Sequence, residues 1–173
     1  KIFDSAYVPL DEENKIYRIV LHEKEDDNHQ SIIDITNPIG GNIEQDLKRR
    51  DLTINAIAVN IHTGEILDLF GGTADIKNKT LNYIEETNFV DDPLRLLRVY
   101  RFQALLNFDI TDKTRSVILK YNKLINKPAK ERINYELMKM FSGAYTDKAL
   151  LNMDTTRLLK EIFPVINELK QVP

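Results

Sequence analysis

The sequence contains no cysteine, and this absence excludes several kinds of site. A disulfide framework, a thiolate zinc site, an iron–sulfur cluster and a cysteine nucleophile all need that residue. Histidine occurs only at positions 22, 29 and 62, which argues against a histidine-rich metal cage. No apolar run approaches the roughly 18 residues of a membrane-spanning helix, and no signal peptide opens the chain. We therefore expect a cytoplasmic protein with no membrane partner.

The composition is that of an ordinary folded protein. The 173 residues are 42% hydrophobic and 29% charged, and this length corresponds to one domain or two small ones. A chain of this size buries roughly two-thirds of its unfolded surface, so it needs no disulfide or structural metal to fold. Acidic residues outnumber basic ones before residue 48, and the reverse holds after it. The second part is therefore better suited to meeting phosphate groups.

The first half of the chain has the patterns of strands. Runs rich in apolar, aromatic and β-branched residues predict strands at 5–10, 16–22 and 31–36. Residues 42–50 predict a short helix with Asn42 as its N-cap. Two further strand-like runs, 53–61 and 65–70, flank a short glycine-containing turn and predict a hairpin, followed by a helical turn or two at 73–79.

From residue 92 onward the pattern becomes helical. Asp92 as N-cap and Pro93 at the first position predict a helix to about residue 106, and Thr111 or Asp112 begins a second to about 125. A third follows Pro128 and ends at Gly143, which suits a left-handed cap. Shorter helical pieces are expected at 147–153, 155–162 and 164–171. The predicted fold class is α+β, with the β-rich part first.

A cluster of polar residues interrupts the start of the predicted hairpin. The helix dipole explains Lys48 and Arg49, because cations are favoured at the C-terminal end of a helix. It does not explain Asp51 and Asn55, which lie among small and apolar residues. Two guanidinium groups, of Arg49 and Arg50, beside a carboxylate and an amide are able to bind a triphosphate and a ribose hydroxyl. The alternative is that this run is only a charged helix end.

A second cluster begins the long helix. Arg95 lies in the first turn, where a cation opposes the helix dipole, and Arg95, Arg98 and Arg101 recur every three residues along one side. A solvated, salt-bridged face is the alternative explanation, but such faces usually mix lysine and glutamate, whereas this one carries arginine alone.

Asp92 and Arg95, one helical turn apart, present a carboxylate acceptor beside a guanidinium donor. Cytosine and adenine each offer an amino donor next to a ring-nitrogen acceptor, so both match this pair. Guanine and uracil offer the opposite order and would leave polar groups unpaired, at roughly 1–3 kcal/mol for each buried group. The pair is therefore able to select C and A without a nucleic-acid template.

Two other acidic positions are less decisive. Arg132 and Glu136 are four residues apart on a predicted helix and should pair with each other, or else brace the arginine helix. Asp34 lies between apolar residues of a predicted strand, so it is on the exposed face or is a metal ligand. One carboxylate does not make a two-metal site.

Taken in order, these motifs resemble a known family. The segments RRDLTINA at 49–56, DLFGG at 68–72 with Asp75, and DDPLRLLR at 91–98 with Arg101 resemble the class II (bacterial-type) tRNA nucleotidyltransferases, which include bacterial poly(A) polymerases. Order and spacing match over about residues 30–142. The resemblance implies part of a nucleotidyltransferase β-sheet head at 1–85, a helical neck that reads the base at 86–145, and the start of a helical body at 146–173.

The resemblance also implies roles for individual residues. Nucleotide contacts fall on Arg50, Asp51, Asn55, Asp92, Arg95, Arg98 and Arg101. A flexible connector between head and neck falls on Asp68, Gly71, Gly72 and Asp75. Arg132 and Glu136 match the motif that braces the neck, and Asp34 matches a third carboxylate of the wider superfamily.

The chain also departs from the family. The family's Asp-x-Asp strand, which holds two Mg²⁺ ions, does not occur anywhere in the 173 residues. The resemblance therefore implies that Lys1 lies inside a longer protein, that the main Mg²⁺ ligands precede it, and that this chain alone is inactive.

The function implied is template-independent addition of C and A, from CTP and ATP, to the 3′ end of tRNA. Alternatives within the family are an enzyme that adds only CC, one that adds only A, or a poly(A) polymerase. Outside it, a non-catalytic RNA- or nucleotide-binding module and a helical scaffold with a merely charged surface stay open. The oligomeric state is not implied.

Overall fold

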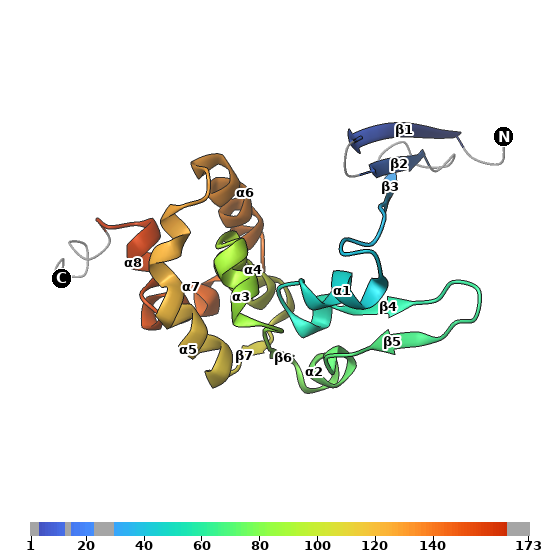
Figure 1. Cartoon of the computed structure of the whole chain (residues 1–173). Helices are drawn as coiled ribbons and strands as arrows, with labels where there is room; N and C mark the ends of the chain where they lie inside the picture. Colours follow the sequence, from blue (N-terminus) through green and yellow to red (C-terminus); the bar gives the residue numbers. More distant parts are fainter. Residues whose placement is uncertain (1–3, 13–14, 23–29, 166–173) are drawn as a thin grey trace. The chain divides into compact units, whose positions relative to one another are not determined.

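The computed structural model describes residues 4–12, 15–22 and 30–165 (Figure 1). The chain divides into two compact units, Lys1–Asp46 and Leu47–Pro173. These units reflect packing, and the domain boundaries expected at residues 85 and 145 stay predictions.

The first unit is an antiparallel sheet in sequence order, which confirms the three predicted strands. They are β1 (Asp4–Asp11), β2 (Ile16–His22) and β3 (Gln30–Ile35). The pairing of β2 with β3 places Arg18 opposite Asp34, and the guanidinium binds both carboxylate oxygens at 2.7 and 2.8 Å. Helix α1 (Ile43–Lys48) follows, and Asn42 accepts a hydrogen bond from the Gln45 amide at 2.8 Å, as expected of its N-cap.

The predicted hairpin is present but shorter than expected. It consists of β4 (Ile57–Val59) and β5 (Ile66–Asp68), whereas η1 (Thr53–Asn55) is a 3-10 helix and not the start of a strand. Thr53 makes its hydrogen bonds outside the hairpin. Its hydroxyl donates to Asp75 at 2.6 Å, and its main-chain amide donates to the Asn82 carbonyl at 3.0 Å.

The four predicted connector residues build the start of helix α2 (Gly72–Asn78). Asp68 accepts from the amides of Gly72 and Thr73 at 2.7 and 2.8 Å, and Gly71 is left-handed with φ 77°. A side chain at Gly72 would meet the Thr53 carbonyl oxygen, so only glycine fits there. Asp75 accepts from Thr53, Thr80 and Asn82 at 2.6–2.9 Å. These residues therefore have definite structural partners.

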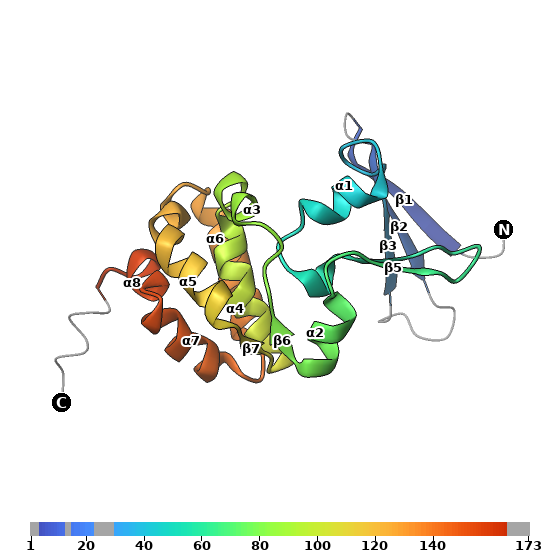
Figure 2. The ribbon, with the colours of Figure 1, turned by 60° about the horizontal axis from the view of Figure 1, so that its bottom comes forward.

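The rest of the second unit is helical (Figure 2). Its elements are β6 (Thr80–Leu81), α3 (Glu86–Asp91), α4 (Leu94–Leu106), β7 (Asp109–Ile110), α5 (Asp112–Tyr121), η2 (Asn122–Asn126), α6 (Lys130–Phe141), α7 (Thr146–Thr155) and α8 (Leu158–Ile162). Helix α4 packs against both α6 and α7, and Leu96, Leu97 and Tyr100 are fully buried there. Strands β6 and β7 pair in parallel beside it. No helix among the described residues is long and apolar enough to cross a membrane.

Two local expectations for the helices were wrong, and one helix was missed. Asp92 does not cap α4, because its carboxylate faces Arg132; the helix begins after Pro93 without a side-chain cap. Helix α3 was not predicted. Gly143 is not left-handed. It is needed because α6 ends against α4, where a Cβ would lie 2.5 Å from the Ala104 carbonyl oxygen. The piece expected at 164–171 lies almost wholly outside the described residues.

Candidate functional site

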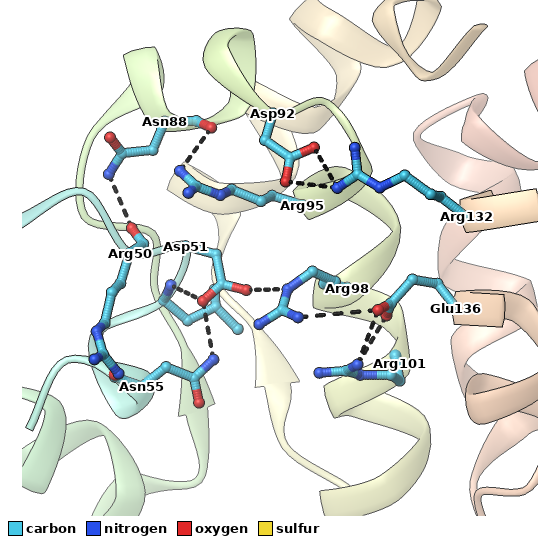
Figure 3. A network of polar contacts seen from close by, with 11 residues as sticks. Arg50, Asp51, Asn55, Asn88, Asp92, Arg95, Arg98, Arg101, Arg132 and Glu136 are labelled. Atoms are coloured by element: carbon cyan, nitrogen blue, oxygen red, sulfur yellow. Dashed lines mark hydrogen bonds and ion pairs between the residues drawn. The ribbon is translucent and has the colours of Figure 1, made fainter. Parts of the chain in front are cut away.

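One pocket of about 630 Å³ in the second unit collects most of the predicted nucleotide-binding residues. Its walls come from the segment before η1, the start of α4 and the inner side of α6 (Figure 3). It is lined by Arg49, Arg50, Asp51, Asn55, Asp92, Leu94, Arg95, Arg98, Glu131, Arg132, Tyr135 and Glu136. Residues from three separate motifs of the sequence thus share one surface.

Asp51 holds the centre of this network. Its side chain is 4% exposed, and Oδ1 accepts from the Leu52 amide and the Asn55 side chain at 2.9 Å each. Oδ2 accepts from Arg98 Nε at 2.6 Å. Burial alone would raise the pKa of Asp51, but the charge of Arg98 and these hydrogen bonds hold that pKa below its ordinary value. Asp51 is thus an anion that positions Arg98 and Asn55.

A buried amide that the sequence did not single out connects the walls. Asn88 of α3 is 4% exposed, and its Nδ2 donates to the carbonyls of Lys48 and Arg50 at 2.8 Å each. The main-chain carbonyl of Asn88 accepts from Arg95 Nη1 at 3.0 Å. Arg50 in turn donates to the Asn55 carbonyl at 2.9 Å. No sequence pattern marks Asn88, because its partners are far from it along the chain.

The predicted base-reading pair lies in the pocket, and both members already have partners. Arg132 Nη2 lies 3.2 and 3.3 Å from the two carboxylate oxygens of Asp92, whose side chain is 32% exposed. Burial lowers the pKa of Arg95, with Asp51 and Asp92 opposing that shift. Burial would likewise lower the pKa of Arg98, but the charge of Asp51 raises it above its ordinary value. Both guanidinium groups stay cationic at neutral pH.

The expected pairing of Arg132 with Glu136 was wrong. Helix α6 packs on α4, so both side chains find their partners on or beside α4 and not on their own helix. Arg132 pairs with Asp92, and Glu136 lies 2.9 Å from Arg101 Nη1 and 3.9 Å from Arg98 Nη1. Both side chains thus link α6 to α4 or to the residue just before it, and their role as a brace of the neck stays a prediction.

Arg101 and Asp34 are not among the residues that line the pocket, and neither are the four connector residues. Arg101 is 8% exposed, is absent from the pocket lining and binds Glu136. Its guanidinium, like that of Arg98, packs over the Phe102 ring. Asp34 belongs to the first unit, where Arg18 occupies both of its oxygens and lowers its pKa through their hydrogen bond.

The described residues offer no cluster of metal-ligating side chains. Among residues 4–12, 15–22 and 30–165, no group of three or more histidine, cysteine or acidic side chains is arranged to hold a metal ion. The acidic residues lining the pocket do not fit the role either, since Asp51, Asp92 and Glu136 each bind an arginine. The described residues therefore do not fit Mg²⁺ coordination.

The geometry suits an anionic, hydrogen-bonding ligand. Five arginines line the pocket, and three of its four acidic side chains are already bound to arginines. The pocket therefore offers a ligand mainly cationic guanidinium groups, with the carboxylates of Asp92 and Glu131 also in its lining.

Comparison with known proteins matches two family models. The Poly A polymerase head domain matches residues 10–82, and the "probable RNA and SrmB-binding site of polymerase A" matches residues 107–170. A CCA-adding enzyme of Lactobacillus delbrueckii is 39% identical over 122 residues, covering 69% of this chain and 31% of the relative. A CC-adding tRNA nucleotidyltransferase of Geobacter sulfurreducens is 35% identical over 158 residues, covering 91% and 36%. The chain thus spans about a third of the length of these relatives.

Solved structures agree with these matches. The Bacillus stearothermophilus CCA-adding enzyme in complex with CTP is 28% identical with a TM-score of 0.75, covering 91% of this chain and 40% of that one. The Thermotoga maritima CCA-adding enzyme complexed with tRNA is 29% identical with a TM-score of 0.76, covering 94% and 39%. The expected α+β arrangement of small sheets followed by helices is confirmed.

Proposed function

Because the chain belongs to the class II CCA-adding tRNA nucleotidyltransferase family, we propose that its pocket binds and selects the nucleotide that such an enzyme adds to RNA. The reaction joins CMP and AMP, from CTP and ATP, to the 3′ end of tRNA and releases pyrophosphate. The complexes of similar enzymes with CTP and with tRNA support this choice of ligands. A cytoplasmic location is part of this proposal, and the bacterial relatives support it.

The observation that carries the proposal is the position of Asp92 and Arg95 on one wall of the pocket. Asp92 lies in an extended conformation between α3 and α4, and Arg95 lies in the first turn of α4. An amino donor of cytosine or adenine bonds Asp92, and the adjacent ring nitrogen accepts from Arg95. Uracil and guanine would meet Asp92 with a carbonyl and Arg95 with an N–H, so both contacts would be lost.

The segment from Arg49 to Asn55, together with Arg98 of α4, supplies contacts for the rest of the nucleotide. Arg49, Arg50 and Arg98 line the pocket and provide guanidinium donors for phosphate oxygens, while Asn55 provides an amide for the ribose. Asp51 acts through Arg98 and Asn55, because its own oxygens are already bound to them.

A nucleotide has to compete with contacts that are already made. Arg132 donates a hydrogen bond to the Asp92 carboxylate, and Arg95 donates one to the main-chain carbonyl of Asn88. Both contacts are compatible with a bound base. A carboxylate has about four acceptor sites and a guanidinium has five N–H donors, so each group retains capacity for the base edge.

The chain's own residues bind and orient the nucleotide in this account, and we assign no chemical step to a metal. The two-metal chemistry of phosphoryl transfer needs a set of carboxylates that the described residues do not provide. We propose that this chain by itself extends no RNA.

Addition of CC alone is a second candidate. The CC-adding relative from Geobacter sulfurreducens covers 91% of this chain, more than the CCA-adding relative from Lactobacillus delbrueckii covers. Both kinds of enzyme need a pocket that accepts C, so the pocket alone does not separate them.

A direct test measures the binding of CTP, ATP, UTP and GTP to the chain by calorimetry. We expect CTP and ATP to bind at least about tenfold more tightly than UTP and GTP, because the wrong bases leave two polar contacts unmade. The same preparation, given Mg²⁺, CTP and tRNA without its 3′ end, should give no extension. Equal affinity for all four nucleotides would contradict base selection, and measurable extension would contradict the missing metal site.

A further inference from the structure

Asn88 makes two kinds of contact, one with each of two segments that line the nucleotide pocket. Its side-chain Nδ2 donates to the main-chain carbonyls of Lys48 and Arg50 at 2.8 Å each, and Figure 3 shows the bond to Arg50. Its main-chain carbonyl accepts from the Asp92 amide at 3.3 Å and from Arg95 Nη1 at 3.0 Å. The side chain thus holds the end of α1, and the main chain holds the proposed base-reading pair.

The two carbonyls that share the Nδ2 group flank a cation of the pocket, Arg49. Lys48 is the last residue of α1, where main-chain carbonyls have no partner within the helix. The Arg50 amide donates to the Leu47 carbonyl at 3.2 Å, which closes a turn over the same residues. Arg49 itself is half-buried and lines the pocket. The main chain on both sides of this cation is therefore fixed by the side chain of Asn88.

Arg49 is held close to a second cation. Burial lowers the pKa of Arg95, the charges of Asp51 and Asp92 oppose that shift, and the charge of Arg49 adds to it. Arg49 and Arg95 both line the pocket, so two guanidinium groups that repel each other face the same space. An anion bound between them relieves this repulsion. A group with several negative oxygens, such as a triphosphate, suits that position.

A purely structural role for the Asn88 amide has to be distinguished from a role in binding. A buried amide that bonds main-chain carbonyls stabilises the fold whatever the pocket does. Asn122 is a matched case, because it is 7% exposed and its Nδ2 donates to the Thr156 carbonyl at 3.0 Å. It does not line the nucleotide pocket. The two asparagines therefore differ in whether the segment they hold carries a pocket cation.

We propose that Asn88 is a positioning residue, whose side chain directs Arg49 toward the phosphates of the bound nucleotide. This inference rests on the proposed function, which supplies the nucleotide. Asn88 is not part of the pocket lining, so it acts through the segment that it holds. Its contacts with Asp92 and Arg95 use the main-chain carbonyl, which every residue type provides. Loss of the side chain should therefore weaken phosphate binding and spare base selection.

The test titrates CTP, UTP and cytidine into the unmodified chain and into Asn88→Ala, followed by NMR signals of the folded protein. Asn88→Ala should lower the ratio of CTP affinity to cytidine affinity about tenfold or more, as expected for loss of one charge-assisted contact. The ratio of CTP affinity to UTP affinity should change by less than about twofold. Arg49→Gln should cause a similar loss, and the two changes combined should lose no more than the larger single loss, because both act on one contact.

Asn122→Ala is the control, and both affinity ratios should survive it even where the fold is less stable. Asn88→Ser provides a second variant should Asn88→Ala fail to fold. A single hydroxyl cannot donate to both carbonyls, so this variant should also lower the ratio of CTP affinity to cytidine affinity.

An unchanged ratio in the Asn88 variants would overturn the proposal, as would an equal fall in Asn122→Ala or additive losses for Asn88→Ala and Arg49→Gln. Failure of the nucleotide proposal would appear separately, as equal binding of CTP and UTP by the unmodified chain.

Discussion

Replacing Asp51 by asparagine should destabilise the protein by about 3 kcal/mol, near the lower end of the loss seen when a buried ion pair loses one partner. The asparagine side chain has one oxygen and one NH₂ group, so its NH₂ must face either Arg98 or Asn55, both of which are donors. The substitution also removes the negative charge that compensates the half-buried Arg98 guanidinium. The loss is not larger because Arg98 keeps 30% side-chain exposure and has Glu136 at 3.9 Å. Urea unfolding of the two proteins at neutral pH measures it.

The same substitution should change how stability depends on pH. The pKa of Asp51 is lower in the folded protein than its ordinary value of 3.8, so the unfolded chain binds its proton more readily. Its stabilisation is therefore complete above about pH 5 and is lost as the pH falls through the folded pKa. The Asp51→Asn variant should lack this part of the fall in the free energy of unfolding at acid pH.

Asp112→Asn is the control for both measurements. Its side chain is 97% exposed and pairs with Arg115 at the surface, so the change should alter stability by no more than about 1 kcal/mol. An Asp51→Asn variant as stable as this control, with an unaltered acid limb, would contradict the anchoring role of Asp51.

Replacing Asp92 by alanine should abolish the preference for CTP and ATP over UTP and GTP. The substitution removes the acceptor for the amino group of C and A, and it also removes the repulsion between that acceptor and the carbonyl oxygen of U and G. The ratio of the affinities for CTP and ATP to those for UTP and GTP should therefore fall by about tenfold or more. It also releases Arg132, which adds attraction for every triphosphate alike. The ratio of affinities between bases, and not the absolute affinity, is therefore the quantity to measure by calorimetry.

Arg95→Ala should give the same convergence, because it removes the donor half of the pair. Asp112→Ala, which removes a carboxylate from α5 outside the pocket, should leave the ratios unchanged. Ratios that survive in both Asp92→Ala and Arg95→Ala would show that another group reads the base.

The elements that could be predicted from the sequence are those with strong local signals. Asn42 caps the helix it was expected to cap, and Thr111, one of the two residues expected to begin a helix, caps α5, because an N-cap bond is made within three residues. The hairpin and α4 follow from periodicity and from the turn at Gly64. Asp92 and Arg95 were singled out because hydrogen-bond donors and acceptors can be read from residue types alone; both line the pocket, and their role in reading the base stays a prediction.

The features that could not be predicted depend on contacts between distant parts of the chain. The strand expected at Thr53 became a 3-10 helix because its hydroxyl binds Asp75, twenty-two residues away. Arg132 and Glu136 satisfied the local rule for pairing on a helix, but the packing of α6 on α4 supplied other partners. Asn88 joins main-chain carbonyls about forty residues earlier, a link that appears only in the folded chain.

The contact between Asp92 and the amino group of the base is the central claim, and one double-mutant cycle tests it most directly. CTP and its analogue lacking the 4-amino group are each titrated into the unmodified chain and into Asp92→Ala. The account predicts that loss of the amino group weakens binding to the unmodified chain by about tenfold or more and leaves binding to Asp92→Ala unchanged, a coupling of roughly 1.5–3 kcal/mol. An equal loss in both proteins would contradict it.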